Sequence, residues 1–163
     1  MIKIRPYLDQ DWPLICCVHD RAQPAEFLGS CDLRAMTPLA HNPNANQICY
    51  VYDKFVACKG KTIVGFVAID RNCIALLYID PDYQNQGIGK RLLNLALKLI
   101  GSPAYTIVMA GNQRAIAFYK KAGFQEIGSF KSHVSGYPCR FIRLSRMLNS
   151  SLFDLKMINN FPI

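Results

Sequence analysis

The chain has 163 residues, 51% of them hydrophobic, which favours one domain with a sizeable core. No run approaches the roughly 20 apolar residues that a membrane-spanning helix needs, and residues 1–6 lack the apolar core of a signal peptide. The net charge of +8 suggests nucleic-acid binding, but the 19 basic residues are scattered singly or in pairs, without interleaved aromatic residues. We therefore expect neither a membrane nor a nucleic-acid partner.

The seven cysteines are an odd number and include no C-x-x-C pair. Cys49, Cys58 and Cys73 fall within apolar runs, where a free thiol packs as a small hydrophobic group. This pattern argues against a disulfide framework and against a metal site. We therefore expect free thiols and a reducing compartment, the cytoplasm.

The first third of the chain predicts one strand and two helical pieces. Residues 2–5 alternate as a short strand, and a helix capped by residues 9–12 extends to about Arg21. A second helical piece should run from Pro24 to about Leu33. Residues 36–47 hold two prolines among polar neighbours, so we expect a loop there.

Strands and helices alternate through the rest of the chain. Strands are expected at residues 50–57, 62–69, 73–79, 105–109, 124–128 and 140–147, and helices at 88–100 and 112–122. Lys59-Gly60 predicts a hairpin turn, and residues 131–138 predict a polar loop. We expect one α/β domain over residues 1–148, followed by a tail, 149–163, whose role the sequence does not indicate.

The most informative segment joins the apolar run 74–79 to the helix at 88 through a loop that holds Gly87 and Gly89. The first N–H groups of a helix lack intrahelical partners, and glycine lets an anion approach the backbone, so this order suits a phosphate ligand. The dinucleotide fingerprint fails because Leu92 occupies its third glycine position, and the triphosphate loop fails on spacing. The remaining pattern, Gln84-x-x-Gly87-x-Gly89, resembles the acetyl-coenzyme A signature of the GCN5-related N-acetyltransferase (GNAT) family.

The helix that follows has an apolar face and a basic face. Lys90 and Arg91 lie at its N-terminal end, where the helix dipole disfavours cations by about 0.3–1 kcal/mol each. Two interpretations remain open: solvent screens these charges, or a bound polyanion such as coenzyme A reverses the sign of the interaction.

A second segment resembles the same family. Asn112-x-x-Ala115-x-x-Phe118-Tyr119-x-x-x-Gly123-Phe124 matches the family's second signature at every fixed position. Asn112 suits a helix N-cap and Gly123 the left-handed position after the helix. Two motifs in the family's order identify the chain as a small, bacterial-type member of the GNAT family, with the resemblance covering about residues 2–147.

This resemblance implies a mixed, mostly antiparallel sheet of about six or seven strands, flanked by about four helices. Its fourth and fifth strands should splay apart to admit the pantetheine arm of acetyl-CoA. The residues implied to bind the cofactor are Leu77, Tyr78, Ile79, Gln84, Asn85, Gln86, Gly87, Ile88, Gly89, Lys90, Arg91, Asn112, Ala115, Phe118 and Tyr119.

Acetyl transfer needs an amine, a partner for the charge that develops on the carbonyl oxygen, and a proton for the departing thiolate. Tyr119 is the implied general acid, because a tyrosine stays protonated at neutral pH. A tyrosine that only packs against the cofactor strand is the alternative. Backbone N–H groups along residues 77–79 would polarise the thioester carbonyl if the strands diverge there.

The general base stays open at this stage. Asp80 and Asp82 end the cofactor strand but also suit a turn. Glu26 and Asp32 lie in the region where the family builds its acceptor site and could bind or deprotonate an amine, and His133 also suits a base. Glu26, Tyr78, His133 and Tyr137 are the candidate acceptor-site residues. A chain of water molecules is a further route for the proton.

The predicted activity is transfer of acetyl from acetyl-CoA to a primary amine: a small molecule, a peptide N-terminus or a lysine. The alternative is a catalytically silent CoA-binding module, which the presence of Tyr119 argues against. The 11 acidic residues are dispersed, which disfavours a polycationic acceptor. We expect a monomer or a homodimer.

Overall fold

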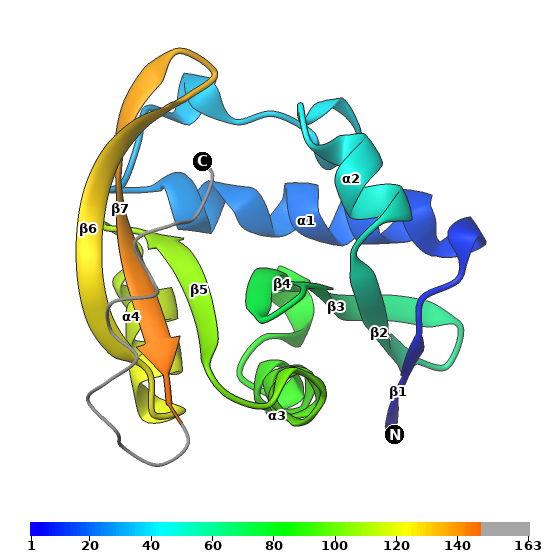
Figure 1. Ribbon diagram of the computed structural model, residues 1–163. Helices are drawn as coiled ribbons and strands as arrows, with labels where there is room; N and C mark the ends of the chain where they lie inside the picture. Colours follow the sequence, from blue (N-terminus) through cyan, green and yellow to red (C-terminus); the bar gives the residue numbers. More distant parts are fainter. Residues whose placement is uncertain (148–163) are drawn as a thin grey trace.

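The computed structural model describes residues 1–147, so the predicted tail lies outside the described residues (Figure 1). One open sheet runs in the order β1-β2-β3-β4-β5-β7-β6 and is antiparallel except between β4 and β5. Its strands are β1 (Ile2–Pro6), β2 (Asp53–Lys59), β3 (Thr62–Asp70), β4 (Cys73–Ile79), β5 (Ala104–Met109), β6 (Gln125–Val134) and β7 (Tyr137–Arg146). The predicted fold class is confirmed.

The described chain also forms four α-helices and four short 3-10 helices. The α-helices are α1 (Trp12–Phe27), α2 (Ala45–Tyr50), α3 (Ile88–Ile100) and α4 (Gln113–Lys121), and the 3-10 helices are η1 (Asp9–Asp11), η2 (Leu33–Ala35), η3 (Leu39–His41) and η4 (Pro81–Tyr83). Within residues 1–147, no helix has both the length and the apolar character needed to cross a membrane.

Helices cover both faces of the sheet, with α1 and α2 above it and α3 and α4 below it in Figure 1. Alternation along each strand therefore divides the core in two. On β3, Val67 belongs to the same core cluster as Leu92 of α3, whereas the neighbouring Phe66 belongs to the cluster that holds Ile15 and Val18 of α1. This near-continuous burial explains why β3 is apolar at almost every position.

The sheet divides between β4 and β5. These two strands pair only at Cys73 with Tyr105 and at Ile74 with Thr106, where the Thr106 hydroxyl donates a 2.9 Å hydrogen bond to the Ile74 carbonyl. Ala75 is the additional residue of a bulge on β4, because Ala68 of β3 pairs with Leu76 and the next residue, Ile69, pairs with Ile74. A bulge bends its strand, so β4 leaves β5 beyond Ile74.

Two predicted element boundaries were wrong. Helix α1 is continuous through Pro24, although the sequence predicted a break there. Pro24 faces solvent while Ile15 and Phe27 are buried on the other side, so packing maintains the helix at the loss of one hydrogen bond. Residues 45–50, predicted as loop and strand start, form α2.

The predicted polar loop 131–138 was also wrong, because β6 and β7 continue into it and meet at a two-residue turn. Ser135 and Gly136 both have positive φ, 49° and 83°, which suits a tight hairpin. Strand β6 lies at the edge of the sheet and alternates exposed and half-buried positions along much of its length, so its polar composition resembled that of a loop.

Cysteine pairing is a further correction. A disulfide joins Cys31, which follows α1, to Cys139 on β7, whereas the sequence argued against disulfides. The two residues are 108 positions apart, and only the fold brings them together. The other five cysteines are free thiols, and Cys16 and Cys58 are buried as apolar groups.

Candidate functional site

A cleft of about 610 Å³ opens where β4 and β5 diverge. Glu26 of α1 lines it on one side of the sheet, and Lys90 of α3 and Tyr119 of α4 line it on the other. The cleft therefore passes through the sheet, and a ligand in it would contact both helical layers.

The loop between β4 and α3 forms one end of the cleft. Gly87 is the N-cap of α3 in the left-handed conformation, with φ of 76°, and a Cβ built on it would meet no atom within 4 Å. The N–H of Arg91 bonds to the carbonyl of Gly87, so the N–H groups of Ile88, Gly89 and Lys90 have no acceptor within the helix. These groups, with open space before them, fit a diphosphate.

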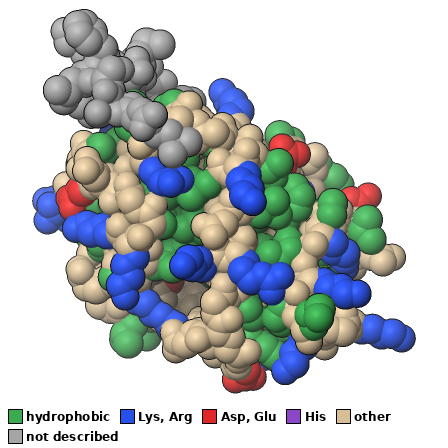
Figure 2. All heavy atoms as spheres, turned by 90° about the horizontal axis from the view of Figure 1, so that it is seen from below, with side chains coloured by type: hydrophobic (Ala, Val, Ile, Leu, Met, Phe, Trp, Pro, Cys, Tyr) green, Lys and Arg blue, Asp and Glu red, His purple; other side chains and the backbone are tan. Residues whose placement is uncertain are grey.

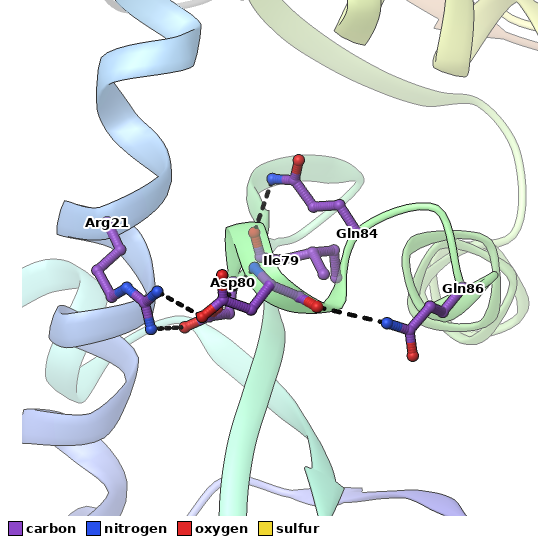
Figure 3. Close-up of polar contacts among 6 residues, drawn as sticks. Arg21, Ile79, Asp80, Gln84 and Gln86 are labelled. Atoms are coloured by element: carbon purple, nitrogen blue, oxygen red, sulfur yellow. Dashed lines mark hydrogen bonds and ion pairs between the residues drawn. The ribbon is translucent and has the colours of Figure 1, made fainter.

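Side-chain hydrogen bonds hold this loop in place (Figure 3). The Gln84 Nε2 donates to the carbonyl of Ile79 at 3.0 Å, and the Gln86 Nε2 donates to the carbonyl of Asp82 at 3.4 Å. Gln84 lines the cleft, but Gln86 does not. The two glutamines thus shape the backbone that faces the ligand.

Arg21 of α1 holds the end of β4 from the opposite layer. Its two terminal nitrogens bond to Asp80 Oδ2 and Asp82 Oδ2, each at 2.8 Å, and Figure 3 shows the guanidinium directed at Asp80. Asp80 is buried, and its other oxygen accepts from the N–H of Asp82. Asp80 and Asp82, two of the carboxylates considered as bases, are therefore engaged in fixing the turn.

Arg114 of α4 is a site residue that the sequence analysis did not identify. Its guanidinium donates to Gln84 Oε1 at 2.6 Å and to Asn85 Oδ1 at 3.2 Å, and it lines the cleft. Arg114 occupies a variable position of the second signature, in the first turn of α4. The available signal was a cation in the first turn of the helix that Asn112 caps.

Lysine and arginine side chains outnumber acidic ones on the face that holds α3 and α4 (Figure 2). Lys90, Arg114 and Lys121 line the cleft on this side, whereas Arg91 instead donates to the carbonyl of Ile2 at 3.1 Å. The local charge therefore complements a phosphate-bearing ligand.

Helix α4 presents Tyr119 to the cleft. Asn112 caps the helix as predicted, its Oδ1 accepting from the N–H of Ala115 at 3.1 Å. Tyr119 is 5% exposed and packs edge-on against Phe118 and Phe124. Burial raises the pKa of Tyr119 well above its ordinary value, an effect that its contact with Thr106 opposes, so the phenol keeps its proton at neutral pH.

The α1 side of the cleft holds a carboxylate and a second phenol. The Tyr78 hydroxyl donates a 2.5 Å hydrogen bond to Glu26 Oε2, and both residues line the cleft. Burial raises the pKa of Glu26, and the hydrogen bond from Tyr78 opposes that rise. The His19 ring lies edge-on to Tyr78, 4.7 Å between centroids.

The other acceptor-site candidates lie outside the cleft lining. His133 is exposed on β6, and Tyr137 is half-buried at the start of β7 with the Arg34 guanidinium 5.1 Å above its ring. Asp32 pairs with Arg34 at 2.6 Å, and hydrogen bonds from that residue lower the pKa of Asp32 to about 2. The structure thus separates these residues from Glu26 and Tyr119.

Further lining residues were not predicted because they occupy no fixed position of either motif. They are Ala22 and Ala25 of α1, Ile74, Ala75 and Leu76 of β4, Tyr83 of η4, Thr106, Ile107 and Val108 of β5, and Ala117 and Lys121 of α4. The only sequence signal for the β5 residues was the expectation that the fourth and fifth strands splay apart, which would place β5 along one side of the gap.

A sequence model of the acetyltransferase (GNAT) domain matches residues 46–126, the stretch that contains both signatures and all the cleft-lining residues except those of α1. The chain belongs to the GNAT family. The peptidyl-lysine N-acetyltransferase YjaB of Salmonella typhimurium is 39% identical over 82 residues, which are 50% of this chain and 55% of YjaB. The chain thus spans about half the length of this curated relative.

Two solved GNAT structures show the same fold. A GCN5-related N-acetyltransferase from Rhodopseudomonas palustris superposes with a TM-score of 0.79 at 18% identity, covering 90% of this chain and 95% of the other. The PaiA N-acetyltransferase from Thermoplasma acidophilum, in complex with coenzyme A, gives a TM-score of 0.71 at 18% identity and covers 91% and 99%. At this identity the likeness concerns the fold.

Proposed function

We propose that this GNAT protein transfers acetyl from acetyl-CoA to a primary amine. The observation that carries the proposal is the buried phenol of Tyr119 in a cleft whose other end is the open N-terminus of α3. That cleft offers backbone donors and cations to a diphosphate and a proton donor further along. The named activity of the Salmonella relative, on peptidyl-lysine, supports an amine acceptor.

Each part of the cleft has a separate task in this proposal. The N–H groups of Ile88, Gly89 and Lys90, with Arg114 and Lys121 beside them, would bind the diphosphate. Acetyl-CoA supplies a thioester, whose carbonyl the free edge of β4 would polarise. Tyr119 would give its proton to the sulfur as the C–S bond breaks.

The acceptor would reach the thioester from the α1 side, because α3 and α4 flank the diphosphate end. A lysine side chain, a peptide N-terminus or a small amine all present the primary amine that this chemistry needs. We propose the cytoplasm as the compartment, which the five free thiols support and the Cys31–Cys139 disulfide opposes.

Tyr119→Phe tests the proposal directly. Thiol release with an accepted amine should fall about 10²–10⁴-fold, the usual contribution of general acid catalysis, with the dissociation constant for CoA unchanged. Tyr50→Phe, at a phenol that is 78% exposed on α2, is the matched control and should behave as wild type.

Two results would contradict the proposal. Equal rates for wild type and Tyr119→Phe would remove Tyr119 from the reaction. No thiol release by the wild type with any amine, despite heat on titration with acetyl-CoA, would support the silent CoA-binding module instead.

A further inference from the structure

Two titratable groups approach the cleft from opposite helical layers. Tyr119 enters from α4 below the sheet, and Glu26 enters from α1 above it. They are close enough that the Glu26 charge contributes to the raised pKa of Tyr119. A reacting group between them would have a proton donor on one side and a carboxylate on the other.

Glu26 is distinguished from every other carboxylate considered for the base. Asp80 and Asp82 are bound by Arg21, and Asp32 is bound by Arg34. Among the described residues that line the cleft, Glu26 is the one carboxylate. Its hydrogen-bond partner is a neutral phenol rather than a cation, so it retains the ability to accept a proton.

Tyr78 fixes where that carboxylate points. It belongs to the α1 face of β4 with Leu76, whereas Leu77 and Ile79 belong to the α3 face. Tyr78 stacks on Phe66, 5.9 Å between centroids, and its hydroxyl meets Glu26 from 52 residues away in sequence. The phenol thus holds Oε2 and leaves Oε1 for a ligand.

We propose that Glu26 is the general base for the acceptor amine and that Tyr78 is its positioning residue. The inference rests on the proposed function and deepens it. A primary ammonium gives one proton to Glu26, and the free nitrogen attacks the thioester carbonyl, forming the C–N bond. As the C–S bond breaks, the sulfur takes the Tyr119 proton, and the second proton lost by the nitrogen restores that phenol.

The same geometry indicates the class of acceptor. One carboxylate can receive one ammonium, and the small side chains of Ala22 and Ala25 line the α1 wall beside it. The described residues that line the cleft include no second carboxylate, so a further ammonium group on the acceptor would have no ion-pair partner there. The acceptor class is therefore a primary amine on a body without further positive charge, not a polyamine.

The pH dependence of the reaction follows from the groups that face Glu26. These are His19 of its own helix, Tyr78 of β4 and Tyr119 of α4. Burial raises the pKa of Glu26, and the Tyr78 hydrogen bond and His19 lower it. A base must be ionised to act, so kcat/KM should rise with pH through the Glu26 pKa. Removing the Tyr78 hydroxyl should move that rise to higher pH.

The experiment compares wild type, Glu26→Gln and Tyr78→Phe, with Asp32→Asn as a control at a half-buried carboxylate outside the cleft lining. Thiol release is measured between pH 5 and 9 with one monoamine that the wild type accepts, alongside spermidine. We expect kcat/KM for Glu26→Gln to fall about 10²–10⁴-fold and to lose its rise with pH on the acidic side of the profile (the acid limb). The affinity for CoA should stay unchanged. Tyr78→Phe should keep part of the activity with its acid limb shifted upward.

Thermal melts separate this role from a structural one. An ionised Glu26 with a raised pKa costs stability as pH rises through that pKa, so at neutral pH Glu26→Gln should melt no lower than wild type. If Glu26→Gln kept the wild-type kcat/KM and the wild-type fall in activity at low pH, the role of Glu26 would be overturned while the proposed function stood. If spermidine reacted as well as the monoamine, the proposed acceptor class would be overturned, again without affecting the proposed function. Absence of turnover in the wild type would overturn both.

Discussion

The two sides of the divided sheet are assembled differently. On the cofactor side, the contacts within the loop and at the helix cap are short in sequence: Gln84 bonds five residues back to Ile79, and Asn112 bonds three residues on to Ala115. Arg21 and Arg114 add outer ties to this loop from 59 and 30 residues away. On the acceptor side, the Tyr78 bond to Glu26 spans 52 residues and the disulfide spans 108.

This difference teaches which half of a GNAT site a sequence can encode in motifs. A loop whose inner hydrogen bonds come from its own side chains can be encoded in a short motif, and the ties from Arg21 and Arg114 then reinforce it. The acceptor side depends instead on where α1 and the β6–β7 hairpin come to rest, so its shape is a property of the whole fold. Breaking long-range ties should therefore alter the acceptor side and leave cofactor binding unchanged.

Reducing the Cys31–Cys139 disulfide should give the largest effect. Opening a loop of this length should lower the free energy of unfolding by about 2–4 kcal/mol. Urea denaturation with and without reductant measures the change, and calorimetry with CoA should give the same affinity in both. Cys17→Ser, at an exposed free thiol, is the control. A changed CoA affinity on reduction would break the comparison.

Gly111→Ala should have the next largest effect. A Cβ at this position would lie 2.2 Å from the backbone oxygen of Gly29, so the segment after α1 must move away from the β5–α4 connection. We expect a loss of about 1–3 kcal/mol in the free energy of unfolding. Gly128→Ala, where a Cβ meets nothing within 4 Å, should cost less. Equal losses at the two sites would contradict the close approach.

Arg114→Met should have the smallest of these effects, and it acts on the cofactor side of the cleft. It removes the bonds to Gln84 and Asn85 and one cation from the cleft, so the dissociation constant for CoA should rise about three- to tenfold. Arg140→Met, an exposed arginine of β7, is the control. If Arg114→Met instead slowed turnover at saturating acetyl-CoA, its role would extend to the acceptor side.

The sequence predicted the elements that build the α3 and α4 side of the cleft, but not how α1 and the β6–β7 hairpin close the other side. The strand that ends at Ile79, the glycine loop, α3 and the Asn112 cap follow from local rules of backbone geometry and helix ends. Glu26 and Tyr78 were named separately, but their hydrogen bond was not, because it depends on the bulge at Ala75 and on the path of α1. That path was mispredicted at Pro24, where burial of the opposite helix face outweighs the local preference of proline.

The polar hairpin and the disulfide were missed for a related reason. An edge strand exposes many of its side chains, so composition alone does not separate β6 from a loop. Cys31 and Cys139 carry no local signal of pairing, because the spacing that matters is the one between β7 and the segment after α1.

Because β4 pairs with β5 at only two positions, the sheet consists of two parts, β1–β4 and β5–β7, that are joined at one end. We call these two parts the leaves of the sheet. Hydrogen bonds between strands resist shear strongly, but none crosses the gap beyond Thr106. The stiffness of the molecule across that line comes from the helical layers and from ties such as the Cys31–Cys139 disulfide, which joins the segment after α1 to β7. Spreading the leaves would disturb side-chain packing before it broke any backbone ladder, so it is the soft direction for this protein's motion.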